Sequence, residues 1–234
     1  MKYGSITTGI IADGLIFHTD AANRASYPKK GTTLTDTIGS QTGTLSTDEM
    51  FDPTQGEGTL AFDQVDDNVN FGNPSVLQIT GALSTNIWFK TSSTSNQGLF
   101  TKGSGYFQNP TGKVYELGIL SQILYFQICD GTTAKNVNYN VSSFLNGSWN
   151  NIAGQWDGTT NTNGIELYFN GELVDQTTST ITSIQNTGLD FVFSDTTGTR
   201  KFGGSLGSFQ IYNRALSANE VLHNYNALKG RFGL

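Results

Sequence analysis

Acidic side chains are the residues of this chain that could cleave glycosidic bonds, so their spacing is considered first. A retaining glycosidase needs two carboxylates about 5 Å apart, which on a strand places acids at alternate positions facing one cleft. The predicted strands instead carry isolated acids: Glu116 in KVYELG, Glu166 in GIELYF, and Glu172 with Asp175 in ELVDQ. None forms an E-x-D-x-x-E arrangement. We therefore interpret these acids as solvated groups on outer strand faces and do not expect an enzyme.

Oxygen-bearing side chains in predicted loops offer a second kind of chemistry, the binding of calcium. Calcium takes clustered oxygen ligands, and the candidate ligands are Asp20, Asp36, Asp66 and Asp67. The Asp-Asp-Asn sequence at 66–68 also suits an ordinary hairpin turn, because such side chains bond to their own backbone. We favour the turn and keep calcium as the lesser alternative, with no other cofactor expected.

Aromatic side chains could stack on the C–H face of a sugar ring. Tyr106 and Phe107, in the Gly-rich segment GSGYFQNPTG, are the best candidates for exposed ligand-binding rings, and Tyr139 is a weaker one. Large aromatic residues are more often buried. Three tryptophans are therefore expected to fill the interior: Trp88, Trp149 and Trp156.

Cysteine and histidine are too few to suggest nucleophilic catalysis or zinc binding. Cys129 lies in the apolar run ILYFQIC, and one cysteine makes no intrachain disulfide. The two histidines, His18 and His223, have no Cys or His at ligand spacing. We expect a buried thiol and histidines with ordinary structural or surface roles.

Composition and charge narrow the class of protein. The chain has 234 residues, 28 glycines, only 14% charged residues and a net charge of −6. This balance would not neutralise phosphates, so nucleic acid is not an expected partner. No apolar run is long enough to span a membrane, and the first residues lack a signal-peptide pattern. We expect synthesis in a cytoplasm and no membrane insertion.

Short segments of alternating hydrophobicity, separated by turn residues, run through the chain and predict an antiparallel β-sandwich. The predicted strands or strand groups are 14–20, 59–71, 83–91, 113–120, 123–129, 134–141, 148–158, 165–176, 188–194 and 208–212. Residues 113–141 are expected to form a three-stranded meander. No linker or internal repeat is evident, so a single domain is expected over 1–234, with an N-terminal arm at 1–13.

Two local signals are especially clear. Asn170-Gly171 between IELYF and ELVDQ predicts a type I′ hairpin turn. Near the end, Ser217 and Glu220 have the spacing of a capping box, flanked by Leu216 and Val221 as a hydrophobic staple. A helix is therefore predicted over 217–229, followed by a tail at 230–234.

Several segments, taken in order, resemble the laminin-G-like, concanavalin A-like jelly-roll domains. They are GLIFHTDAANRASYP, LAFDQVDDNVNFG, LSTNIWFKT, WNNIAGQWDGTTNTNGIELYFNGELV and FGGSLGSFQIYNRALSANEV, and together they cover nearly the whole chain. The resemblance implies an all-β, two-sheet antiparallel jelly roll with a short C-terminal helix. Many such domains bind calcium where an Asp precedes the strand before that helix. Here Gly207 or Ser208 stands at that place, so a calcium site of that type is not expected.

A narrower resemblance links DAAN-x-x-SYP and IYNRALS…EVLHNYNALKGRFG to stand-alone laminin-G-like proteins of tailed bacteriophages. It implies a non-enzymatic virion protein, a capsid decoration or a tail or fibre surface component, that assists adsorption to host glycans. Expected partners are other virion proteins and further copies of this chain. The expected assembly contacts are Tyr225, Arg231, Phe232 and Leu234. The alternatives are a stand-alone carbohydrate-binding module or lectin and, after it, a glycoside hydrolase.

Overall fold

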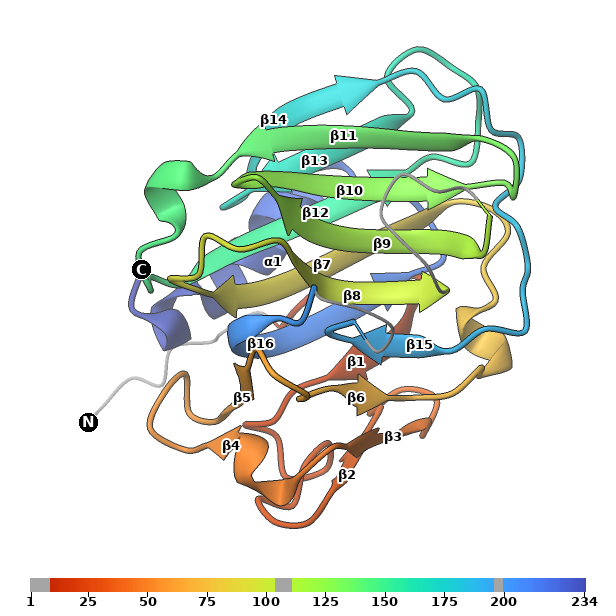
Figure 1. Ribbon diagram of the computed structural model, residues 1–234. Helices are drawn as coiled ribbons and strands as arrows, with labels where there is room; N and C mark the ends of the chain where they lie inside the picture. The colour runs from red at the N-terminus through yellow and green to blue at the C-terminus, as the bar shows by residue number, and fades with distance from the viewer. Residues whose placement is uncertain (1–8, 104–110, 196–199) are drawn as a thin grey trace.

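The computed structural model describes residues 9–103, 111–195 and 200–234, and these residues form two facing β-sheets with a helix near the C-terminus (Figure 1). In spatial order, sheet A contains β14 (Glu172–Thr177), β13 (Ile165–Phe169), β12 (Asn150–Trp156), β7 (Leu83–Lys90), β16 (Gly203–Tyr212), β5 (Thr59–Asp63) and β4 (Phe51–Asp52), with β1 (Leu15–Thr19) also paired to β16. Sheet B contains β11 (Ala134–Asn140), β10 (Ile123–Cys129), β9 (Lys113–Leu120), β8 (Gln97–Gly103), β15 (Phe191–Phe193), β6 (Val69–Asn70), β3 (Thr42–Leu45) and β2 (Thr33–Thr35).

All of the strand pairs in these residues are antiparallel, so the predicted all-β jelly-roll sandwich is confirmed. Short 3₁₀ helices interrupt the loops: η1 (Asp48–Met50), η2 (Ser75–Leu77), η3 (Ser142–Phe144) and η4 (Gly230–Phe232). The described part of the chain contains no helix long and apolar enough to cross a membrane.

The core lies between the sheets because alternate residues of each strand point inward. On β12, Ile152 and Trp156 face the core, as the alternation predicts. A cluster of phenylalanines fills the middle, with Phe17, Phe191 and Phe209 in mutual ring contact at centroid distances of 5.8–6.1 Å. The two sheets therefore pack against each other through large side chains. Side chains with other functions can lie on the outer faces of the sheets.

The Asn170-Gly171 turn and the meander are confirmed. Asn170 and Gly171 both have positive φ, 52° and 84°, as a type I′ turn requires, and Phe169 pairs with Glu172 across it. Strands β9, β10 and β11 pair in order.

The C-terminal helix α1 (Ala218–Lys229) lies against the outer face of sheet A. Ser217 caps it, and the reciprocal capping box with Glu220 is formed as predicted. Leu216 and Val221 pack with Tyr212 of β16 in one buried cluster. Tyr225 follows on the same helix and stacks on Trp88 of β7, with ring centroids 5.6 Å apart.

The predicted hairpin at the Asp-Asp-Asn sequence is wrong. The strand before it, β5, belongs to sheet A, and the strand after it, β6, belongs to sheet B. A turn does form at 66–68, but it leads the chain from sheet A to sheet B. Strands β2, β3, β4 and β8 lie outside the predicted strands.

Candidate functional site

One row of side chains crosses all eight strands of sheet B in direct register. Each member is the cross-strand partner of the next. In spatial order the members are Thr33, Thr44, Asn70, Val192, Thr101, Glu116, Gln127 and Asn136. Seven of the eight are polar, so we call this set the polar row.

The polar row lies on the outer face of sheet B. Direct cross-strand partners share a face, and strand neighbours point the opposite way. The neighbours Val69, Leu117 and Phe126 belong to the core between the sheets. The row therefore faces away from the core. On the outer face of a β-sandwich, polar side chains are ordinarily exposed to solvent.

The middle of the row is nonetheless buried and closely hydrogen-bonded. Thr101, Glu116 and Gln127 are at most 4% exposed. Lys113 places its Nζ 2.8 Å from a Glu116 carboxylate oxygen and donates to Thr101 Oγ1 at 3.1 Å. Gln127 Nε2 donates to the other Glu116 oxygen at 2.9 Å. Burial raises the pKa of Glu116, and the Lys113 ammonium opposes this rise.

Two further groups flank this middle part. Arg200 donates to Asp195 at 3.0 Å, and both side chains are largely buried. Cys129, next on β10, accepts a hydrogen bond from Gln127 Nε2 at 3.4 Å, and burial raises the pKa of its thiol to about 12. Glu116 and Asp195 are thus each held by a cation, which does not favour the pair of free carboxylates that a glycosidase uses.

The other end of the row opens to the surface. A groove of about 540 Å³ lies over β3 and β6, and Asn70 Nδ2 donates there to an oxygen of Asp190 at 2.9 Å. The groove is lined by Thr42, Thr44, Leu45, Ser46, Asn68, Asn70, Phe71, Gly72 and Asp190. Hydroxyl, amide and carboxylate groups therefore converge on one open hollow, above the buried ring of Phe71. We call it the sheet B groove.

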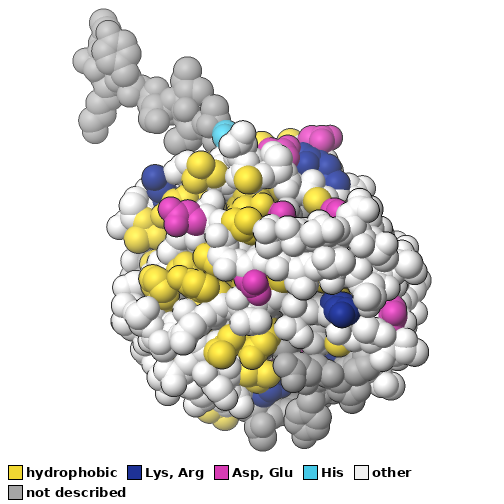
Figure 2. Space-filling view, turned by 90° about the horizontal axis from the view of Figure 1, so that it is seen from above, with side chains coloured by type: hydrophobic (Ala, Val, Ile, Leu, Met, Phe, Trp, Pro, Cys, Tyr) yellow, Lys and Arg dark blue, Asp and Glu magenta, His cyan; other side chains and the backbone are white. Residues whose placement is uncertain are grey.

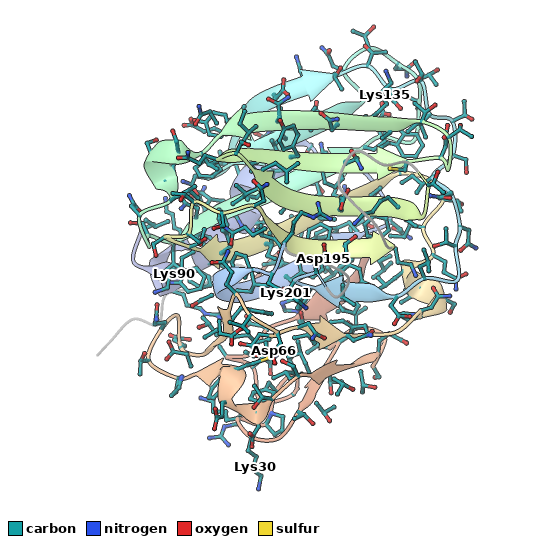
Figure 3. The ribbon with its side chains drawn as sticks, viewed as in Figure 1. Lys30, Asp66, Lys90, Lys135, Asp195 and Lys201 are labelled. Carbon is teal, nitrogen blue, oxygen red and sulfur yellow. The ribbon has the colours of Figure 1, made fainter. Side chains whose placement is uncertain are left out.

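A second, acidic hollow of about 430 Å³ adjoins the groove. Asp63, Asp66 and Asp67 lie in it with carboxylate oxygens within 4.8 Å of one another. Figure 3 shows Asp66 on the lower part of the molecule, below Asp195. Asp67 accepts from the Asp63 N–H and Asp63 accepts from the Val65 N–H, as in ordinary turns. Burial raises the pKa of Asp67.

The structure does not bring all four predicted calcium ligands together. Asp66 and Asp67 share the acidic hollow, and Asp63 is the neighbour that sequence reasoning missed. Asp20 instead pairs with Arg231. Asp36 accepts hydrogen bonds from three backbone N–H groups, those of His18, Ile38 and Gly39. Calcium binding by the pair at 66–67 stays a prediction.

A third hollow, of about 570 Å³, is lined by the Ser- and Thr-rich segment 91–95 together with Lys90 and Asp63. Two of its hydroxyls bond to neighbouring segments: Thr91 Oγ1 donates to the Gly203 carbonyl of β16, and Ser93 Oγ donates to Gln64, which follows β5. These two bonds hold the loop against the adjoining segments.

Of the predicted sugar-binding rings, the structure describes Tyr139, which is not part of the groove lining. Tyr139 is half-buried and packs on Phe169, with ring centroids 5.3 Å apart. Tyr106 and Phe107 fall outside the described residues. Trp156 lies in the core between the sheets, as expected. Trp88 and Trp149 are also buried, but on the outer face of sheet A beneath the C-terminal segment.

The predicted assembly residues contact their own chain. Phe232 lies between Trp88 and Trp149, with centroid distances of 4.4 and 4.6 Å. Arg231 pairs with Asp20, and Leu234 keeps half of its side chain exposed. An assembly contact through the tail stays a prediction, and Leu234 is the side chain most open to it.

The two histidines have structural roles in the fold. His18 Nδ1 lies 3.1 Å from Thr37 Oγ1, and its Nε2 lies 3.1 Å from Ser208 Oγ. Burial lowers the pKa of His18. His223, on α1, lies 2.9 Å from the Gly9 carbonyl oxygen.

Sequence reasoning missed most of the polar row. Thr44, Asn70 and Gln127 occupy separate strands, and no spacing along the chain relates them. The available signal was alternation: in VNF and YFQIC, one polar residue faces opposite to its apolar neighbours. That signal places a side chain on an outer face but does not say which residues face each other.

Comparison with solved structures supports the fold. The binding domain of botulinum neurotoxin serotype G has a TM-score of 0.66 and 18% identity, over 90% of this chain and 50% of that chain. The botulinum neurotoxin DC binding domain in complex with SialylT gives 0.65 and 15%, over 92% and 52%. The binding domain of Paraclostridial Mosquitocidal Protein 1 gives 0.66 and 14%, over 92% and 52%. The chain thus spans about half the length of these structures, and the likeness concerns the fold alone.

Comparison of sequences gives the family. A search of curated proteins gives no match. The Laminin_G_3 family, described as "Concanavalin A-like lectin/glucanases superfamily", matches residues 63–222. This range runs from the end of β5 into α1 and exceeds half of the chain. The protein therefore belongs to the concanavalin A-like lectin/glucanases superfamily, as its sequence motifs predicted.

Proposed function

We propose that the protein is a non-catalytic carbohydrate-binding domain that holds a glycan in the sheet B groove. The observation that carries this proposal is the convergence of Thr44, Asn70 and Asp190 on one open hollow. Sugar hydroxyls need both donors and acceptors, and these three side chains supply both. The size of the groove, about 540 Å³, is in the usual range for ligand sites of about 300–1,000 Å³.

Rigid placement of these groups supports the proposal. Asn70 and Thr44 are direct cross-strand partners, and the Asn70 amide is oriented by Asp190. Strands hold side chains in place better than loops do, so the freedom that Thr44 and Asn70 lose on binding is small. The binding domains that the chain resembles in fold, one of them solved in complex with SialylT, agree with a recognition role.

The test is glycan-array screening of the protein followed by calorimetry on the strongest ligand. Asn70→Ala and Thr44→Ala should each weaken binding about tenfold or more, because each leaves a sugar hydroxyl unpaired. Asn161→Ala, in an exposed loop, is the matched control and should bind normally. Incubation of the bound glycan should release no shorter product. Failure of every glycan to bind would overturn the proposal.

The finer proposal is that this domain is displayed on a bacteriophage virion, where it assists adsorption to host glycans. The resemblance of the segments at 20–28 and 211–233 to phage-encoded proteins supports this setting. Light scattering with and without a calcium chelator tests it. A stable trimer or larger ring, unchanged by the chelator, is expected. A monomer that loses stability on chelation would argue for a free-standing, metal-dependent module.

A further inference from the structure

We infer that the sheet B groove selects uncharged or amino sugars and rejects sialylated and other acidic glycans. This inference rests on the proposed function and adds the class of ligand to it. It comes from the distribution of charge around the groove.

Asp190 is the one ionisable side chain among the described residues that line the groove. It is exposed, and one of its carboxylate oxygens accepts from Asn70 at 2.9 Å. The remaining polar lining consists of hydroxyl and amide side chains. A ligand in this groove therefore meets a negative charge and no positive one.

The adjoining acidic hollow strengthens this field. Ser46 belongs to the groove, and its hydroxyl donates to Asp67 in the acidic hollow at 3.0 Å. The Ser46 hydroxyl oxygen also accepts a hydrogen bond from the Asn68 N–H at 3.2 Å, so this serine links the two hollows. The described lining of the acidic hollow includes Glu49, Asp63, Asp66 and Asp67 and contains no Lys or Arg.

The cation that acts on Asp190 cannot reach a ligand. Lys102 interacts electrostatically with Asp190, but its side chain is completely buried. Its Nζ donates to Asn73 Oδ1 and to the Leu189 carbonyl. Lys102 thus fixes the loop that carries Asp190 and offers no donor to the groove.

These charges make the groove selective. A sialic acid carboxylate placed beside Asp190 would lose water without gaining a cationic partner, and like charges that face each other in an interface are unfavourable. Rejection through an unmatched charge is a common source of specificity. An ammonium group on an amino sugar would instead donate a charge-assisted hydrogen bond to the Asp190 carboxylate.

The experiment is a glycan array that carries matched neutral, amino and acidic versions of the same cores, such as lactose with 3′-sialyllactose and chitotetraose with its de-N-acetylated form. We expect at least tenfold weaker binding of each acidic member than of its neutral partner. Amino members should bind more tightly at 50 mM than at 500 mM NaCl, since salt screens exposed charges. Asp190→Asn should reduce the difference between neutral and acidic members severalfold. Glu172→Gln changes the net charge by the same amount at an exposed position of β14. It should leave the difference between neutral and acidic members unchanged.

The outcomes separate the two proposals. If no glycan of any charge binds, the proposed function fails and this inference fails with it. If acidic members bind as well as their neutral partners, or better, the selectivity is overturned while carbohydrate binding stands. An Asp190→Asn variant with unchanged selectivity would equally overturn the inference, because Asp190 carries the charge on which it depends.

Discussion

Asp20 and Arg231 lie 211 positions apart and form a two-point ion pair that joins the segment after β1 to the last turn of the chain. Arg231 Nη2 donates to Asp20 Oδ1 at 2.8 Å, and Nη1 donates to Oδ2. The side chains are only 12% and 9% exposed. Arg231 also donates to the carbonyls of Gly56 and Gly58, so one guanidinium fixes three segments.

Loss of Arg231 should therefore destabilise the protein strongly. Arg231→Ala leaves Asp20 charged, buried and without its cation, for which about 3–5 kcal/mol is typical. Asp20→Ala combined with Arg231→Ala should cost less than the sum of the two single changes. Urea unfolding of all three variants measures this coupling. Arg24→Ala, at an exposed position of the same loop, is the control. A loss below about 1 kcal/mol for Arg231→Ala would contradict the prediction.

Phe232→Ala should both destabilise the fold and change the tryptophan fluorescence. The ring lies between Trp88 and Trp149 and is only 6% exposed. Removal of a buried Phe costs about 3–5 kcal/mol, and water would reach both indoles, which should shift the emission to the red. Leu234→Ala, at a half-exposed position two residues on, should change stability by less than about 0.5 kcal/mol. An unshifted spectrum for Phe232→Ala would show that the two tryptophans are covered by other groups.

The capping box of α1 should make stability depend on pH in the acid range. Hydrogen bonds from Arg214 and the Ser217 backbone lower the pKa of Glu220 to about 2. Because the folded pKa lies below the ordinary value, this contribution is complete above about pH 4.5 and is lost as the pH falls toward 2. Ser217→Ala should cost about 1 kcal/mol at pH 7. Glu220→Gln should flatten the acid dependence, whereas Glu172→Gln, at an exposed position, should not. Thermal unfolding between pH 2.5 and 6 distinguishes the two variants.

Local patterns predicted those features whose causes are local. The positive φ values of Asn170 and Gly171, the capping box at Ser217 and the alternation of β12 depend on a few neighbouring residues. The turn at 66–68 is equally clear from its local residues. Those residues do not show to which sheet the next strand, β6, belongs. Strand β5 is placed by its pairing with β16, which lies about 140 residues later, and only that pairing shows the crossing between sheets.

The candidate site required long-range information. Asp20 and Arg231 were considered as a metal ligand and an assembly contact, and their pairing with each other could not be read from either segment. The sheet B groove combines Thr44, Asn70 and Asp190 from three separate parts of the chain. Their proximity follows from strand register, which tertiary packing determines.

Cys129 should be unreactive in the folded protein. Its thiol is completely buried, and burial together with the nearby Glu116 charge raises its pKa to about 12. Because the thiolate is the reactive form, a disulfide reagent at pH 8 should label no cysteine until denaturant is added. Labelling should then follow the unfolding curve measured by circular dichroism. Rapid labelling of the native protein would contradict the burial of the middle part of the polar row, and Cys129→Ser should abolish all labelling.

Lys102 should give the protein a stability that rises with pH in the alkaline range. Burial lowers the pKa of Lys102 from 10.5 to about 8. Between these values the unfolded chain binds one more proton than the folded chain, so the free energy of unfolding increases with pH. Lys102→Met should remove this pH dependence. The difference in the free energy of unfolding between the variant and the wild type should then change by up to about 1.4 kcal/mol per pH unit. Lys30→Met, at a side chain that projects from the lower end of the molecule (Figure 3), is the control.

Urea unfolding at several values between pH 7.5 and 9.5 measures the Lys102 term. Other groups that titrate at high pH are common to the wild type and both variants, so their contributions cancel in the differences. Because Lys102 is completely buried, Lys102→Met adds nothing to the hydrophobic side chains on the upper face of the molecule (Figure 2). Parallel curves for the wild type and Lys102→Met would mean that Lys102 keeps its ordinary pKa.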